Sequence, residues 1–137
     1  MRDIEIRGKR KDNGGWVYGF YKRDHVTGII YIITSGFQYE VIPETVGQWT
    51  GLLDKNGAKI FEGDILKYKE HYYAGKYHTH IGVVEWRENA ACFICESRVI
   101  EGKPTRPDGT GLVALHFKYK AEVIGNIHDN PELLHAN

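Results

Sequence analysis

The segment QWTGLLDKNGAKIFEGDILKY, at positions 48–68, strongly restricts the secondary structure that this chain can adopt. It holds two turn signals close together: Asn56-Gly57, a pair that accepts positive φ, and Glu62-Gly63-Asp64. The Asp64 carboxylate suits acceptance of backbone N–H bonds in the second turn. The segment therefore predicts a tight hairpin, a second turn and a further strand, with no room for a helix. The expected strands are 49–53, 59–61 and 65–68.

Short strands separated by turns are expected along the rest of the chain as well. Asn13-Gly14 predicts another hairpin, and the β-branched run 28–34 predicts a strand buried on both faces. Residues 69–79 and 97–111 are expected to form a protruding hairpin tip and a loop. A helical turn is expected within 43–47, and another after Asn130, where Pro131 suits a first helical position. The further expected strands are 3–8, 16–21, 37–42, 80–86, 91–96, 112–118 and 121–127.

This pattern predicts an all-β protein, because no amphipathic helix of useful length can be found. We expect residues 1–47 to form an antiparallel N-terminal meander. Residues 48–137 are expected to form an SH3-like, partly closed β-barrel that ends in a short helical turn. The 137 residues are enough for one compact unit made of these two subdomains.

Composition limits the classes of partner and the compartment. The formal net charge is zero, which disfavours tight binding to nucleic acid, since phosphate contacts supply most of the non-specific affinity. Five basic residues near the N-terminus can still form a local patch. No signal peptide or membrane span is apparent, so we expect a cytoplasmic protein that makes no membrane contact. The five basic residues are Arg2, Arg7, Lys9, Arg10 and Lys11.

Aromatic and sulfur-containing residues are interpreted as structural. Cys92 and Cys95 form a CxxC, but residues three apart on a strand point to opposite faces, so we expect two core or half-core thiols rather than a redox or zinc pair. Trp16, Trp49 and Trp86 all fall in expected strands, which favours core or seam positions over ligand-stacking ones.

Several of these segments resemble the YopX family of small phage and prophage proteins. The resemblance rests on the IEIRGKR-like opening strand, on residues 48–68, on GVVEW at 82–86, and on EVIGNIHDNPELL at 122–134. It implies an all-β fold with an SH3-like part, a phage or prophage origin in bacteria, and a homo-oligomer. It supplies no catalytic residues. Residues 69–79 and 97–111 match nothing in the family pattern.

The expected hairpin tip carries the candidate binding residues. Tyr and Lys side chains together suit either a protein interface or the stacking and neutralisation of nucleic acid. His78 and His80 share one strand face, and His71 with Glu70 lies nearby, but no local Asp or Cys completes a zinc set, so no metal is expected. The candidate binding residues are Tyr72, Tyr73, Lys76, Tyr77 and His78.

No local pattern predicts catalysis. The chain has no GxSxG, GxGxxG, P-loop or HExxH motif, and no cofactor is expected. An enzyme would need a site assembled from distant residues. We therefore expect a homo-oligomeric protein-interaction module that binds itself and a host or phage protein. The alternative is a nucleic-acid-binding module that uses the hairpin tip and the basic N-terminal turn.

Overall fold

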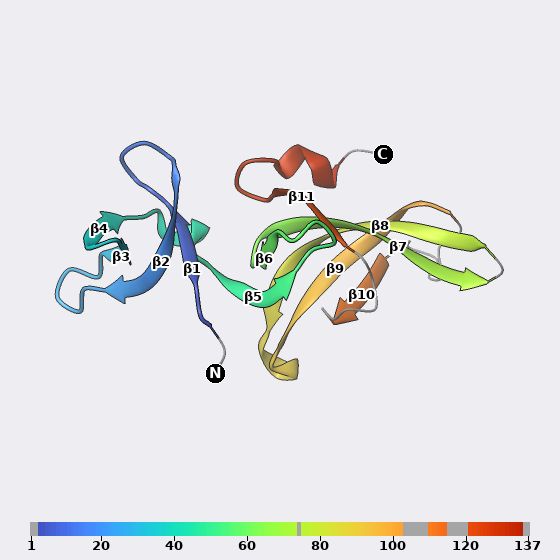
Figure 1. The fold of residues 1–137 in the computed structure, drawn as a ribbon, viewed down its shortest axis with the longest axis horizontal. Helices are drawn as coiled ribbons and strands as arrows, with labels where there is room; N and C mark the ends of the chain where they lie inside the picture. The colour runs from blue at the N-terminus through green and yellow to red at the C-terminus, as the bar shows by residue number, and fades with distance from the viewer. Residues whose placement is uncertain (1–2, 74, 103–109, 115–120, 136–137) are drawn as a thin grey trace. The chain divides into compact units, whose positions relative to one another are not determined.

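The computed structural model describes residues 3–73, 75–102, 110–114 and 121–135. In this part of the chain the regular structure is antiparallel β-strand, with three short 3-10 turns and no α-helix, which confirms the all-β prediction (Figure 1). No helix among these residues has the length and apolar character needed to cross a membrane. Contacts divide the chain into two units, Met1–Gly51 and Leu52–Asn137, so the division falls four residues beyond the predicted boundary at residue 47.

The N-terminal unit is a meander that returns to its first strand. Its strands are hydrogen-bonded in the order β4-β3-β2-β1-β5. Beyond the ends of β1 and β4, Arg10 bridges Val41, and two further backbone bonds hold the same junction. The elements are β1 (Ile6–Lys9), β2 (Trp16–Arg23), β3 (Ile30–Thr34), β4 (Phe37–Glu40), the 3-10 turn η1 (Pro43–Thr45) and β5 (Gly47–Leu53).

The two faces of the N-terminal sheet differ in burial, and we call the face that carries Ile32 and Val41 the inner face and the opposite one the outer face. Ile32 and Val41 are buried on the inner face. Gly8 lies under Val41 so closely that a Cβ on Gly8 would be 3.0 Å from the valine Cβ, which explains a glycine within β1. The run 28–34 is not buried on both faces as predicted: only Ile32 of β3 is fully buried, and the other residues of the strand are half-buried.

The C-terminal unit holds a five-stranded antiparallel sheet in the order β10-β9-β8-β7-β11, and β6 follows the end of β5. Its core contains Ile60, Leu66, Tyr68, Val84 and Cys95. β8 lies between β7 and β9 and pairs with both (Figure 1). The elements are β6 (Lys59–Phe61), β7 (Asp64–Tyr73), β8 (Lys76–Arg87), η2 (Glu88–Ala90), β9 (Cys92–Glu101), β10 (Thr110–Ala114), β11 (Glu122–Asn126) and η3 (Pro131–Leu134).

The 48–68 segment folds as its turn signals predict. Gly57 has φ of +86° in the turn between β5 and β6, a value that asparagine or glycine tolerates best. The buried Asp64 carboxylate accepts a 2.7 Å bond from the Phe61 backbone N–H. The buried Asp54 carboxylate accepts bonds from the backbone N–H groups of Asn56, Ala58 and Val123. Asp54 therefore ties the hairpin turn to β11, a long-range contact within this unit.

Three predictions about the middle of the chain are corrected. The expected tip at 69–79 is mostly strand, because β7 and β8 remain paired as far as Tyr73 and Lys76. The expected loop at 97–111 begins only after Glu101, since β9 continues across β8, and residues 103–109 lie outside the described part. Trp86 is 45% exposed and packs edge-on against Phe93, so it is not a core residue.

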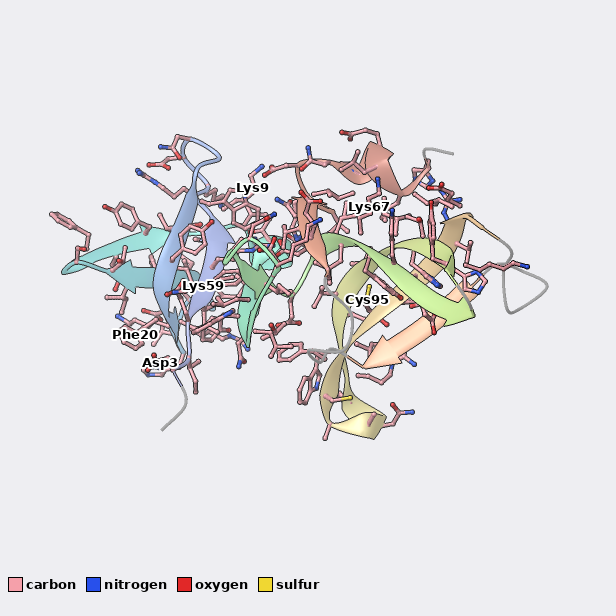
Figure 2. All side chains as sticks on the ribbon, turned by 45° about the vertical axis from the view of Figure 1, so that its right-hand side comes forward. Asp3, Lys9, Phe20, Lys59, Lys67 and Cys95 are labelled. Carbon is pink, nitrogen blue, oxygen red and sulfur yellow. The ribbon has the colours of Figure 1, made fainter. Side chains whose placement is uncertain are left out.

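The cysteines follow the strand geometry expected of them. Both are free thiols, and Cys95 is buried in the C-terminal core (Figure 2). Burial raises the pKa of the Cys95 thiol to about 12, with a smaller effect from the Glu85 carboxylate. A thiol so protonated is a poor nucleophile and a poor metal ligand. The end of the chain forms the 3-10 turn η3, which is shorter and tighter than an α-helical turn.

Candidate functional site

Three of the predicted binding residues lie on β8, and they do not share one face of the sheet. Lys76, Tyr77 and His78 are consecutive on β8, so Tyr77 and His78 lie on opposite faces of the sheet. Lys76 is exposed, Tyr77 is half-buried and His78 is buried. Tyr72 and Tyr73 lie on β7, and their side chains fall outside the described part of the structure.

On one face of the hairpin, Tyr77 is held by its neighbours. Its hydroxyl donates a 3.0 Å hydrogen bond to Glu101, which raises the pKa of Tyr77. The ammonium of Lys69 lies 4.4 Å from the centre of the Tyr77 ring. A lysine over an aromatic face is attracted by the ring quadrupole, so Lys69, Tyr77 and Glu101 form a stabilising polar cluster at the end of the sheet.

The opposite face carries a buried polar network that local sequence patterns did not reveal. The Ser97 hydroxyl lies 2.8 Å from the Tyr68 hydroxyl and 3.1 Å from His80 Nδ1. His80 Nε2 lies 3.2 Å from a carboxylate oxygen of Glu70. The His80 ring is stacked on the ring of Tyr68, with centroids 4.9 Å apart. The strand pairings Tyr68–His80 and Gly82–Ser97 bring these groups together across three strands.

Serine, histidine and glutamate in contact are the side chains of a nucleophilic triad, but the geometry favours a structural role. Ser97 is 5% exposed, and its hydroxyl is shared with Tyr68, so a substrate from solvent has no direct approach to it. Burial lowers the pKa of His80, the Glu70 carboxylate opposes this shift, and His78 adds to it. His80 is therefore neutral at pH 7, and the network is a buried polar extension of the core that is held by the Tyr68–Ser97 and Ser97–His80 contacts.

This lowered pKa predicts an acid-sensitive fold. As the pH falls through the ordinary histidine range near 6.5, the unfolded chain takes up a proton that folded His80 resists, so stability is lost toward acid. The loss for one proton is at most about 1.4 kcal/mol per pH unit. Urea unfolding of the wild type, His80→Gln and His25→Gln between pH 7.5 and 5.5 measures how the free energy of unfolding depends on pH. This dependence should be weaker in His80→Gln and unchanged in His25→Gln, whose side chain is exposed on a turn. The same pH dependence in all three proteins would contradict the role given to His80.

The histidines do not form a metal site in the described part of the chain. The rings of His78 and His80 share one face, as predicted, with centroids 6.0 Å apart. The backbone of His71 pairs with Tyr77, one position away from the Glu70–His78 pair. No group of three His, Cys, Asp or Glu side chains with metal-binding geometry is found among the residues that the structure describes.

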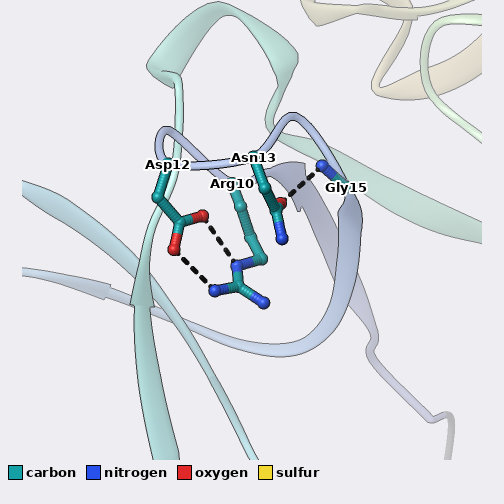
Figure 3. A network of polar contacts seen from close by, with 4 residues as sticks. All are labelled: Arg10, Asp12, Asn13 and Gly15. Atoms are coloured by element: carbon teal, nitrogen blue, oxygen red, sulfur yellow. Dashed lines mark hydrogen bonds and ion pairs between the residues drawn. The ribbon is translucent and has the colours of Figure 1, made fainter.

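The basic N-terminal turn is largely neutralised by its own acids. Arg10 donates two hydrogen bonds to Asp12, at 2.9 and 2.6 Å, and the Asn13 side chain accepts a bond from the Gly15 N–H (Figure 3). The Arg10 bond raises the pKa of the guanidinium and lowers that of Asp12. Lys11 pairs with Glu40 at 3.1 Å. These groups border a cavity of about 280 Å³ lined by Arg10, Lys11, Asp12, Gln38, Tyr39 and Glu40.

The outer face of the N-terminal sheet gathers aromatic and basic side chains that the sequence analysis did not group together. Trp16, Tyr18 and Phe20 alternate along β2, so all three lie on one face. Tyr18 is 44% exposed and Phe20 is 71% exposed. The strand pairs place Lys9 opposite Trp16, Arg7 opposite Tyr18, and Tyr31 opposite Lys22. The signal was present in the i, i+2 spacing of aromatics in WVYGFYK, although we assigned Trp16 to the core.

The inner face carries a separate apolar group near the β3–β4 turn. Tyr21, Ile32 and Tyr39 form one row across β2, β3 and β4, and Phe37, two residues before Tyr39 on β4, lies on the same face. Ile32 is fully buried, whereas Phe37 is 64% exposed and Tyr21 is exposed. The rings of Phe37 and Tyr39 are 6.4 Å apart. We call Tyr21, Phe37 and Tyr39 the inner aromatic patch.

Comparison with known proteins identifies the chain. The sequence pattern of the family described as YopX protein matches residues 5–135, which is nearly the whole length. A comparison with curated proteins finds no match. The matched span includes the 48–68 turns, the β7–β9 ladder and the closing η3 turn, so the whole described fold falls inside it. The chain belongs to the YopX family.

Proposed function

We propose that this protein is a phage-type, homo-oligomeric protein-interaction module that works by binding rather than by catalysis. The observation that carries the proposal is the exposure of large apolar side chains on the N-terminal unit. Phe37 and Tyr21 are two of them, and both belong to the inner aromatic patch. Exposed aromatic groups of this kind mark protein contacts more often than free surface.

The inner aromatic patch suits a second copy of the same chain. The patch lies on the same face as the buried Ile32 and reaches the exposed Phe37. A partner that covers the patch would therefore extend the apolar core around Ile32. Ring-to-ring contacts of Phe37 and Tyr39 across a two-fold axis would give the isologous interface that homodimers use. A host or phage protein is the further partner that we propose, in the bacterial cytoplasm.

Self-association is expected to depend on Phe37. Phe37→Ser removes the most exposed ring of the patch, and we expect it to weaken the oligomer about 10-fold or more, as for an aromatic anchor at an interface. Light scattering across micromolar concentrations measures the mass. Val26→Ser is the matched control, because Val26 is 82% exposed but lies on the β2–β3 turn at the other end of β3. A wild type that remains a monomer at high micromolar concentration rejects the proposal.

The alternative function, nucleic-acid binding by the hairpin tip and the basic turn, receives less support at those residues. Lys11 and Arg10 are paired with acids, and Tyr77 is bonded to Glu101. An SH3-like closure of the C-terminal unit remains part of our proposal for how the module is built. It is supported by the sharp turn at Gly63, whose backbone N–H bonds the Val84 carbonyl.

A further inference from the structure

We propose that the outer face of β1, β2 and β3 is a stacking platform for single-stranded nucleic acid. This platform consists of Trp16, Tyr18 and Phe20 on β2, flanked by Lys9 on β1 and by Lys22 at the end of β2. It is a different surface from the inner aromatic patch, since Phe20 and Tyr21 are neighbours on one strand and lie on opposite faces. The inference is therefore independent of the proposed self-association.

The spacing of the three rings suits bases. Same-face residues on a strand repeat about every 6.8 Å, twice the about 3.4 Å between stacked bases. Successive rings thus leave room for one base between them. Tyr18 and Phe20 are the exposed members, and each offers a ring face with no sequence preference, because every base has a π-face.

The charges around the rings are arranged for a polyanion. Lys9 lies 5.9 Å from the Trp16 ring centre, and Lys22 lies 6.0 Å from that of Tyr31, so the platform has an ammonium group at each end of the aromatic row. Arg7 is 6% exposed and lies 4.6 Å from the Trp16 ring centre, where it positions the indole. The strand register also places an acidic residue, Glu40, on this face, opposite Tyr31. The carboxylate of Glu40 forms a salt bridge with Lys11.

A protein partner fits this face less well than nucleic acid does. Protein interfaces are depleted of lysine at their centres, whereas grooves that follow a single strand combine lysine with stacked aromatics. The zero net charge of the chain limits non-specific affinity but does not remove a local site. With two lysines engaged, the half-buried Lys9 and the exposed Lys22, binding should be weak and only moderately sensitive to salt, with a slope of log affinity against log salt of about −1.4.

Fluorescence anisotropy with labelled dT and U oligonucleotides of about 20 nucleotides tests the platform. At about 50 mM salt we expect a Kd on the order of 10 μM for either single strand, and weaker binding to a duplex of the same length. Phe20→Ser and Tyr18→Ser should each weaken binding about 10-fold through lost stacking. Lys22→Ala should also weaken it and make the salt slope shallower by about 0.7.

The matched control is Phe37→Ser, which removes an equally exposed ring from the inner face and should leave oligonucleotide affinity unchanged. Circular dichroism checks that each variant keeps its strand content. Three results overturn the platform: no binding of either single strand at about 50 mM salt, preference for the duplex, or Phe20→Ser and Tyr18→Ser changing the oligomer mass without changing oligonucleotide affinity. The last result would assign the outer face to a protein contact. If the wild-type protein binds single strands but does not self-associate, only the proposed interface at Phe37 is contradicted.

Discussion

Replacing Gly82 by alanine is expected to lower the free energy of unfolding by about 3 kcal/mol. Gly82 lies in the middle of β8, paired with Leu66 on β7 and with Ser97 on β9. A Cβ there would lie 2.4 Å from the Glu96 carbonyl oxygen and 2.6 Å from the Ser97 Cβ. These atoms belong to the adjacent strand, so the methyl group cannot be accommodated by turning a flexible side chain. The ladder itself must move, and the network of Ser97, Tyr68 and His80 moves with it.

Urea denaturation of purified Gly82→Ala measures the loss. Gly15→Ala is the control, because its Cβ would meet only the exposed Asn13 side chain, at 3.1 Å. We expect the control to stay within about 0.5 kcal/mol of the wild type. A Gly82→Ala protein as stable as the control would mean that β8 and β9 do not approach each other as the structure has them.

Replacing Asp54 by alanine is expected to cost about 3 kcal/mol in the free energy of unfolding. The change removes the acceptor for three backbone N–H groups, of which Val123 lies on β11, far away in the sequence. The Asp54 carboxylate is itself buried, and hydrogen bonds to a charged group contribute more than those between neutral groups. The hairpin turn and β11 should therefore loosen together, as shown by faster hydrogen exchange at Asn56, Ala58 and Val123.

Asp24 supplies a matched control within the same chain. Its carboxylate accepts N–H bonds from Val26 and Thr27 in a turn, much as Asp54 does, but it reaches no distant strand. Asp24→Ala should therefore change hydrogen exchange only in its own turn. Equal effects of the two substitutions on global stability would contradict the view that Asp54 joins the turn to β11.

Protonation of the Asp54 carboxyl is also expected to destabilise the fold in acid. Burial alone would raise the pKa of this carboxyl, but the N–H bonds from Val123, Ala58 and Asn56 outweigh burial and lower it. The stabilising contribution is thus present above the ordinary pKa of 3.8, and it is lost as the pH falls through the lower value in the folded protein. Unlike the histidine effect, this loss begins only in strongly acid solution.

The sequence predicted those parts of the fold that are set by neighbouring residues. Asn13-Gly14, Asn56-Gly57 and Glu62-Gly63-Asp64 each place a turn where the structure has one, because positive φ and side-chain acceptors act locally. Strand lengths were predicted less well. Residues 69–79 were expected as a hairpin tip and residues 97–101 as part of a loop, yet β7, β8 and β9 extend through them because each strand supplies hydrogen-bond partners to the next.

The candidate sites show the same limit. The alternation of Trp16, Tyr18 and Phe20 indicates that the residues of the stacking platform share one strand face. Whether that face is exposed to solvent or buried depends on how the whole meander packs. The His80 network was less visible still, because Tyr68, Glu70 and Ser97 come from two other strands. Conversely, the predicted group at 72–78 was close in sequence, and strand alternation placed Tyr77 and His78 on opposite faces.

The central claim is that the two faces of the N-terminal sheet bind different partners. Sedimentation velocity of the wild type, Phe20→Ser and Phe37→Ser, each with and without a labelled dT oligonucleotide, tests it in one experiment. The account predicts that Phe37→Ser lowers the protein mass and keeps the oligonucleotide bound, whereas Phe20→Ser keeps the mass and releases the oligonucleotide. Both variants losing the same property, or neither losing any, would contradict it.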